Sequence, residues 1–101
     1  MSQKAKQRNK EKARNTVSVS FTPEGWEDYS HWREKDAGTF NTVNALIGEC
    51  LRTPFKGTGK PEPLKGDLSG FWSRRINRVD RLVYLFEGGT LTIIQCRFHY
   101  D

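Results

Sequence analysis

The sequence of 101 residues contains no apolar run of membrane-spanning length, and no continuous apolar segment follows its basic start, MSQKAKQRNKEKARN. A membrane-spanning helix needs about 20 consecutive apolar residues, and a signal peptide needs an apolar segment behind its basic start. These two absences argue against the membrane and secreted classes. They predict a cytoplasmic protein that has no membrane partner.

Cysteine and histidine are also scarce, with two residues of each. Cys50 and Cys96 form no close pair and stand among apolar residues, which predicts two buried, reduced thiols rather than a disulfide. His31 and His99 show no metal-ligand spacing with these cysteines, and GTGKPEP lacks the spacing of a phosphate-cradling loop. The sequence therefore predicts neither a metal site nor a cofactor.

The positive charge is distributed unevenly along the chain. The net charge is +5, and the first 15 residues hold all of this excess, with six Lys/Arg residues against Glu11. Because they have no apolar periodicity, residues 1–15 are predicted to be a disordered basic arm, followed by one domain at 16–101. Within that neutral domain, acids dominate from 24 to 49 and bases from 52 to 81. A basic half on a neutral domain favours a binding site for polyanions.

The first half of the domain has the patterning of a strand followed by two helices. Residues 17–21 alternate between apolar and hydroxyl side chains, as a half-buried strand does. Thr22 is a suitable N-cap and Pro23 a suitable first residue for a helix that we expect to break at Gly38. A second amphipathic helix is predicted from about Thr39 to Arg52.

The second half of the domain has the patterning of strands. After a loop rich in glycine and proline at 55–66, three segments contain many β-branched and aromatic residues: GFWSRRI, RLVYLFE and TLTIIQCRFHY. Gly88-Gly89 marks a tight hairpin between the last two segments. The order of elements predicts an α+β fold, in which a small antiparallel β-sheet carries the two N-terminal helices on one face.

Strand alternation predicts which polar side chains share the other face of this sheet. It gathers Arg75, Arg81, Arg97 and His99 near one end, and the proline-framed loop GKPEPLKG adds the carboxylate of Glu62. This set suits metal-free cleavage of RNA. A carboxylate takes the proton of a ribose 2′-hydroxyl, guanidiniums hold the phosphate, and an imidazolium protonates the leaving oxygen. The alternative is that these are ordinary solvated surface charges.

Several motifs in one order resemble the YoeB family of bacterial toxins, in the RelE superfamily. They are RTPFKGTGKPEPLKGDLSGFWSRRI, RLVY and CRFHY, preceded by WEDYSHW and NALI. The resemblance covers roughly residues 17–100. It implies a small α+β fold of the microbial-ribonuclease type. It also implies an endoribonuclease that cleaves mRNA in the decoding site of a translating ribosome, and a YefM-like antitoxin that blocks the site.

The resemblance further implies roles for individual residues. Glu62 corresponds to the general base of the family, Arg81 to its phosphate-binding arginine and His99 to its general acid. Three more residues stand at positions that the family uses for substrate contact or transition-state support: Lys65, Arg75 and Tyr100.

The sequence departs from the family pattern at three places. Asp80 stands where close relatives often have histidine, and Asp101 extends one residue past the usual end. An acid at either place would tune the site or repel RNA. The basic arm at 1–15 lies outside the resemblance, and either anchors on ribosomal RNA or reflects a start site assigned upstream of Val17.

Two functions remain open at this point. The first is a ribosome-dependent endoribonuclease toxin, called an mRNA interferase, that inhibits translation. The second is a nucleic-acid-binding component that acts in operator repression, reaching operator DNA only through its antitoxin, with weak or ribosome-independent nuclease activity. A homodimer is a further option, with exposed aromatic residues such as Phe55 or Trp32 at its contact.

Overall fold

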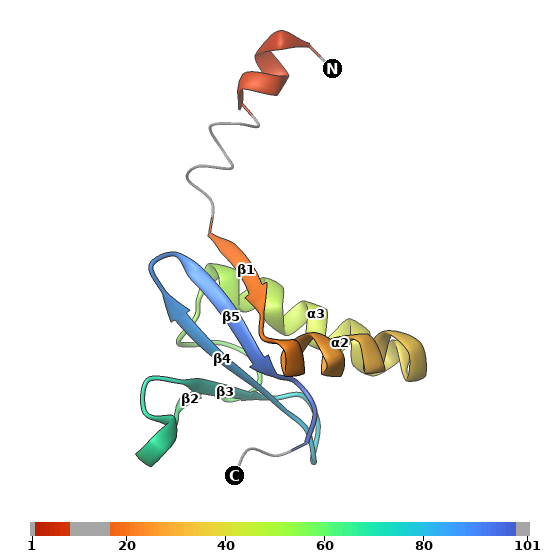
Figure 1. Ribbon diagram of the computed structural model, residues 1–101, viewed down its shortest axis with the longest axis vertical. Helices are drawn as coiled ribbons and strands as arrows, with labels where there is room; N and C mark the ends of the chain where they lie inside the picture. Colours follow the sequence, from red (N-terminus) through yellow and green to blue (C-terminus); the bar gives the residue numbers. More distant parts are fainter. Residues whose placement is uncertain (1, 9–16, 99–101) are drawn as a thin grey trace.

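The computed structural model describes residues 2–8 and 17–98 of the chain (Figure 1). Residues 3–8 form a short helix. Residues 9–16 lie outside the described part, so the division into a disordered arm and a domain at 16–101 stays a prediction. Within the described ranges, none of the helices combines the length and the apolar character that crossing a bilayer requires.

The described strands form one five-stranded sheet in the order β1-β5-β4-β3-β2. Their bounds are β1 Ser18–Phe21, β2 Glu62–Pro63, β3 Trp72–Arg75, β4 Arg81–Glu87 and β5 Thr90–Gln95. Strand β1 pairs in parallel with β5, and the other neighbours pair antiparallel. The predicted α+β class is confirmed, but the sheet is mixed rather than purely antiparallel. Alternation within a strand identifies the strand and not its partner, so the parallel edge pair was missed.

Two helices connect the first strand to the rest of the sheet, α2 at Pro23–Lys35 and α3 at Ala37–Arg52. The predicted cap of α2 is confirmed, because the Thr22 hydroxyl accepts from the backbone of the first turn. The predicted break at Gly38 is wrong. Asp36 separates the helices, since its N–H donates to the Trp32 carbonyl at 3.0 Å and its carboxylate accepts from Thr39 N at 3.0 Å. One aspartate therefore ends the first helix and caps the second.

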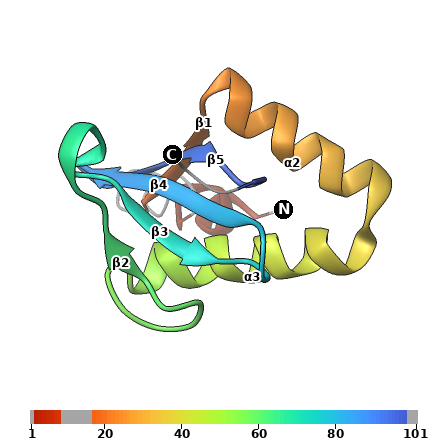
Figure 2. The same cartoon turned by 90° about the horizontal axis from the view of Figure 1, so that it is seen from below.

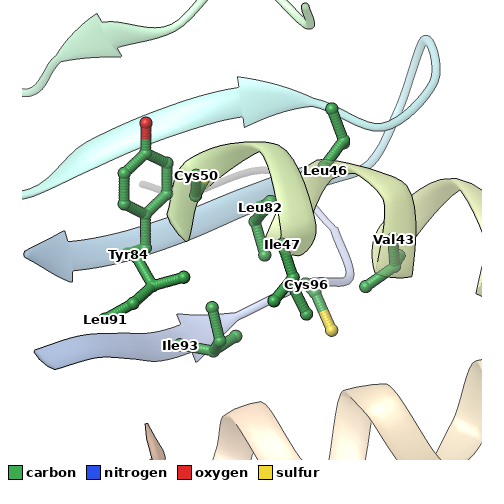
Figure 3. Close-up of a cluster of buried hydrophobic side chains, with 9 residues drawn as sticks. All are labelled: Val43, Leu46, Ile47, Cys50, Leu82, Tyr84, Leu91, Ile93 and Cys96. Atoms are coloured by element: carbon green, nitrogen blue, oxygen red, sulfur yellow. The ribbon is translucent and has the colours of Figure 1, made fainter. Parts of the chain in front are cut away.

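The hydrophobic core lies between α3 and one face of the sheet (Figures 2 and 3). Its buried members come from α3, from β4 and from the last segment of the chain: Val43, Leu46, Ile47, Cys50, Leu82, Tyr84, Leu91, Ile93 and Cys96. Both cysteines are free and buried, as predicted. Helix α2 packs beside α3 and along β5, where Trp32 Nε1 donates to the Cys96 carbonyl at 2.7 Å. The opposite face of β3 and β4 is covered by neither of these helices.

A β-bulge in the last strand changes which side chains face the core. Tyr84 pairs with Ile93 but Val83 pairs with Gln95, so Ile94 is an extra residue in β5. Simple alternation places Ile93 and Gln95 on the same face, and this prediction is wrong because the extra residue reverses the parity of the strand. Ile93 is fully buried in the core, while Gln95 is opposite Val83 on the other face.

Candidate active site

The pairing of three strands brings the predicted acid and two predicted arginines to one face of the sheet. Glu62 in β2 is opposite Ser73 in β3, which is in turn opposite Val83 in β4. One row further along, Arg75 is opposite Arg81. Side chains that are directly opposite in an antiparallel pair point to the same side. Glu62, Arg75 and Arg81 therefore share the face that α3 does not cover.

The frame around Glu62 is attached to β3 on both sides. Before the acid, the Gly59 carbonyl accepts from Arg75 N at 2.6 Å. After it, Leu64 N donates to the Phe71 carbonyl at 2.9 Å, and the Leu64 side chain is buried. Gly59 has a φ of 84°, a left-handed value that glycine adopts without strain. The short strand that carries Glu62 is thus fixed by hydrogen bonds as well as by its two prolines.

A buried arginine holds the loop that leads to this frame. The Arg74 side chain has no exposed surface, and its Nε donates to the Tyr84 hydroxyl at 3.2 Å. Its two terminal nitrogens donate to three loop carbonyls, those of Thr53 at 2.5 Å, Lys56 at 3.0 Å and Thr58 at 3.2 Å. This one guanidinium therefore supplies hydrogen-bond donors to three carbonyls of the loop, which ties the loop to β3.

Tyr84 and Glu49 complete this arrangement, which we call the Arg74 cluster. The Tyr84 hydroxyl donates to the Pro54 carbonyl at 2.6 Å. Glu49 lies 3.5 Å from an Arg74 nitrogen and accepts from Thr58 N at 2.7 Å. Burial raises the pKa of the Tyr84 hydroxyl to about 12, although the Arg74 charge opposes the shift, so Tyr84 stays a neutral donor at physiological pH.

Sequence reasoning did not identify the Arg74 cluster. Alternation placed Arg74 on the apolar face of β3 together with Trp72 and Ile76, where an arginine needs several buried partners. An arginine among apolar side chains was therefore the feature of the sequence that could have indicated this cluster. The partners themselves come from a helix, a loop and a neighbouring strand, and only the fold brings them together.

The backbone immediately before His99 is anchored to the start of β4. Phe98 N donates to Asp80 Oδ1 at 2.6 Å, and the Phe98 carbonyl accepts from Arg81 N at 3.1 Å. The other Asp80 oxygen accepts from Asn77 Nδ2 at 2.9 Å, and only 7% of Asp80 is exposed. Phe98 has a φ of 64°, an uncommon value for a residue with a side chain. Asp80 therefore directs its charge into the protein and anchors the backbone of Phe98.

The structure describes some of the remaining predicted site residues and leaves others outside the described part. Lys65 is exposed and directly precedes η1 (Gly66–Leu68), close in sequence to Glu62. His99 and Tyr100 lie outside the described residues, so their placement stays a prediction. Arg97 does not gather with the other arginines as alternation suggested. Its guanidinium stacks 4.4 Å from the centre of the Phe98 ring and lines a groove along α2.

Comparison with known proteins gives the family. The family model described as the YoeB-like toxin of bacterial type II toxin–antitoxin systems matches residues 21–100. This chain belongs to that family. A toxin YoeB from Streptomyces coelicolor is 56% identical over 84 residues, covering 83% of this chain and 100% of the relative. The resemblance that the motifs indicated is thereby confirmed.

Solved structures of YoeB-family toxins agree with the fold. A YoeB/ParE toxin from Agrobacterium tumefaciens is 49% identical, with a TM-score of 0.80 over 83% of this chain and 100% of that chain. A YoeB dimer from Staphylococcus aureus is 36% identical, with a TM-score of 0.79 over 84% and 99%. A heterotetrameric YoeB–YefM toxin–antitoxin complex from the same organism is 36% identical, with a TM-score of 0.77 over 83% and 98%.

Proposed function

We propose that this YoeB-family toxin is an endoribonuclease that cleaves mRNA in the decoding site of a translating ribosome. The observation that carries the proposal is the register of β2, β3 and β4, which gathers Glu62, Arg75 and Arg81 on the uncovered face of the sheet. A protein that only binds RNA does not need a fixed carboxylate among arginines, because the carboxylate repels phosphate. A general base for a 2′-hydroxyl does need one.

The proposed reaction is an internal transesterification at the phosphorus atom. Glu62 takes the proton of the ribose 2′-hydroxyl, and the 2′-oxygen forms a bond to the adjacent phosphorus. The bond from phosphorus to the 5′-oxygen breaks, and His99 gives its proton to that oxygen. The products are a 2′,3′-cyclic phosphate and a free 5′-hydroxyl. Each of the two proton transfers contributes roughly 10² to 10⁴ in rate.

The other side chains of the site bind the substrate and transfer no protons. Arg81 and Arg75 bind the phosphate oxygens and stabilise the charge that accumulates on them in the transition state. Lys65, next to the frame, adds a positive charge for a neighbouring phosphate. Tyr100 contacts the substrate beside His99. The Phe98 backbone, which directly precedes His99 in the sequence, is hydrogen-bonded to Asp80 and Arg81.

We also propose that a YefM-like antitoxin binds this toxin and blocks the site. The support is the YoeB–YefM complex from Staphylococcus aureus, which contains a chain similar to 83% of this chain. The YoeB dimer from the same organism supports a homodimer in the absence of antitoxin. In this proposal operator DNA is reached only through the antitoxin, and the toxin acts in the cytoplasm, where ribosomes are.

Cleavage on programmed ribosomes tests the enzymatic proposal. Wild type, Glu62→Gln and His99→Gln are compared in the presence of EDTA, with mapping of the cleaved ends. We expect 2′,3′-cyclic phosphate ends from the wild type and at least a hundredfold slower cleavage from both variants. Replacing the attacking ribose by 2′-deoxyribose should abolish cleavage.

Two results would contradict the proposal. Full activity of Glu62→Gln would exclude the acid as the base, and cleavage of DNA by the purified protein with EDTA present would exclude a 2′-hydroxyl mechanism. If wild type leaves programmed ribosomes intact but cuts free RNA or binds operator DNA with its antitoxin, the alternative function is correct instead.

A further inference from the structure

The turn between β3 and β4 lines a cleft in which every charged lining residue is an arginine. The cleft has a volume of about 470 Å³ and is lined by Arg75, Asn77, Arg78 and Arg81. Arg75 and Arg81 belong to the proposed catalytic set. Arg78 does not, and the family resemblance assigns no role to this position.

The three arginines repel one another unless anions neutralise their charges. Arg75 and Arg81 are directly opposite across the ladder, where like charges destabilise an antiparallel pair. Arg78 adds a third positive charge on the turn that joins them. No acidic side chain lines the cleft. The nearest acid in the sequence, Asp80, directs both of its oxygens to Asn77 and Phe98 instead.

Hydrogen bonds hold the turn in one shape. Asn77 Oδ1 accepts from both Val79 N and Asp80 N at 2.8 Å, and Ile76 N donates to the Asp80 carbonyl at 3.0 Å. Arg81 Nη1 donates to the carbonyls of Asn77 and Asp80, at 3.2 and 3.3 Å. The turn thus presents Arg78 from a fixed backbone and ties Arg81 to the same scaffold. A preorganised site of this kind loses little entropy when it binds an anion.

The position of the cleft indicates which anion it takes. In the sheet, Ser73 of β3 is paired with Glu62. Arg75, two residues further along β3, is paired with Arg81, and Arg78 follows on the turn. Rows two residues apart on a strand are separated by roughly 7 Å. A phosphate that meets Glu62 and the Arg75–Arg81 pair therefore leaves Arg78 beyond it, on the side away from the base.

We propose that Arg78 binds a second phosphodiester of the mRNA strand, next to the one that is cleaved. This inference rests on the proposed function, because it takes the RNA strand to run from Glu62 toward the β3–β4 turn. Arg78 binds and orients the substrate but takes no part in the proton transfers. It is a substrate-binding residue that the family resemblance did not supply.

Neutral linkages in the mRNA test this contact on the ribosome. A single methylphosphonate replaces each phosphodiester near the scissile bond in turn, and kcat/KM is measured for wild type and Arg78→Gln. At one flanking position we expect the neutral linkage to lower kcat/KM about tenfold in the wild type and to have no effect in Arg78→Gln. The KM of Arg78→Gln should rise while its kcat stays near that of the wild type.

Binding of free RNA gives a second measurement that needs no cleavage. The probe is a fully 2′-O-methylated oligonucleotide, followed by fluorescence anisotropy over a range of salt concentrations. Loss of one phosphate contact should reduce the slope of log K against log salt by about 0.7 for a single strand. Arg33→Gln, an exposed arginine in the last turn of α2, is the matched control and should keep the wild-type slope.

The outcomes separate this inference from the proposed function. If every neutral linkage affects wild type and Arg78→Gln equally, or if Arg78→Gln keeps the wild-type salt slope, Arg78 does not bind the substrate strand. If Arg78→Gln weakens binding to the ribosome but no neutral linkage in the mRNA has the same effect, Arg78 contacts ribosomal RNA. That result would overturn the inference. Full activity of Glu62→Gln would instead refute the proposed mechanism while the salt slope still decides the role of Arg78.

Discussion

Asp80 Oδ1 accepts a hydrogen bond from Phe98 N at 2.6 Å, which joins the residue just before β4 to the residue that precedes the predicted general acid. The two residues are 18 positions apart in the sequence. Because Arg81 N also donates to the Phe98 carbonyl, both backbone polar groups of Phe98 are hydrogen-bonded. Asp80 therefore supports the Phe98 backbone, and its carboxylate oxygens are directed to Phe98 N and Asn77 Nδ2 rather than to the guanidinium of Arg81.

Replacing Asp80 by alanine should loosen the C-terminal segment. The change leaves Phe98 N and Asn77 Nδ2 without their acceptor, so we expect a loss of about 1–3 kcal/mol in the free energy of unfolding, measured with urea. We also expect slower cleavage of mRNA on ribosomes, because His99 follows the released backbone. Glu87→Ala, which removes an exposed acid at the other end of β4, is the control and should change neither quantity. Equal results for the two variants would show that the anchor has no role.

The Arg74 cluster gives a separate prediction about the loop that leads to Glu62. Tyr84→Phe removes the bond to the Pro54 carbonyl, and we expect it to cost about 1–3 kcal/mol and to slow cleavage. Tyr29→Phe is a matched control, because its hydroxyl makes a bond of 2.8 Å to Asn44 Oδ1 between the two helices, away from the site. Tyr29→Phe should lower stability but leave the cleavage rate of the folded protein unchanged. Equal cleavage rates for the two variants would argue against a positioning role for the cluster.

The two thiols should be unreactive in the folded protein. Burial raises the pKa of the Cys96 thiol to about 12 from its ordinary value of 9.0, with the charges of Asp28 and Asp80 adding to the shift. Burial also raises the pKa of the Cys50 thiol. At pH 8 the thiolate population of Cys96 should be about a thousandfold smaller than in the unfolded chain.

Alkylation by iodoacetamide, followed by mass spectrometry, measures this difference. We expect no modification of the native protein over a time in which both thiols of the denatured protein react completely. Rapid labelling of one thiol under native conditions would show that its surroundings open readily.

Asp28 should make stability depend on pH. The pKa of its carboxyl is raised by burial, and the hydrogen bond from Cys96 N and the charge of Arg97 only partly offset this shift. A carboxyl with a raised pKa binds its proton more tightly in the folded state. Its contribution is therefore complete below the ordinary pKa of 3.8 and is lost as the pH rises through the higher folded value.

We accordingly expect Asp28→Asn to raise the melting temperature at pH 7, since the amide keeps an acceptor for Cys96 N without the partly buried charge. The gain should shrink as the pH falls toward the ordinary pKa of the carboxyl. Thermal unfolding between pH 3 and pH 7 measures both the gain in melting temperature at pH 7 and its decrease at lower pH. A lower melting temperature at pH 7, or a gain that is the same at all pH values, would contradict this account.

Much of the local structure was determined by the sequence alone. Thr22 and Pro23 defined the start of α2, and Gly88-Gly89 defined the β4–β5 hairpin, where both glycines have positive φ. These signals are readable because caps and turns depend on a few neighbouring residues. Alternation in β3 also placed Arg75 correctly on the polar face. The motifs and their order along the sequence were sufficient to identify the family.

Contacts between distant segments were decided only by the tertiary structure. The bulge at Ile94 arises from pairing between β4 and β5, and it reverses the faces that alternation assigns. The register that aligns Glu62 with the arginines, the partners of Arg74 and the anchor from Asp80 to Phe98 all join residues separated by at least ten positions. Periodicity carries no information on such pairs, because it describes which way a side chain points and not what the fold brings opposite to it.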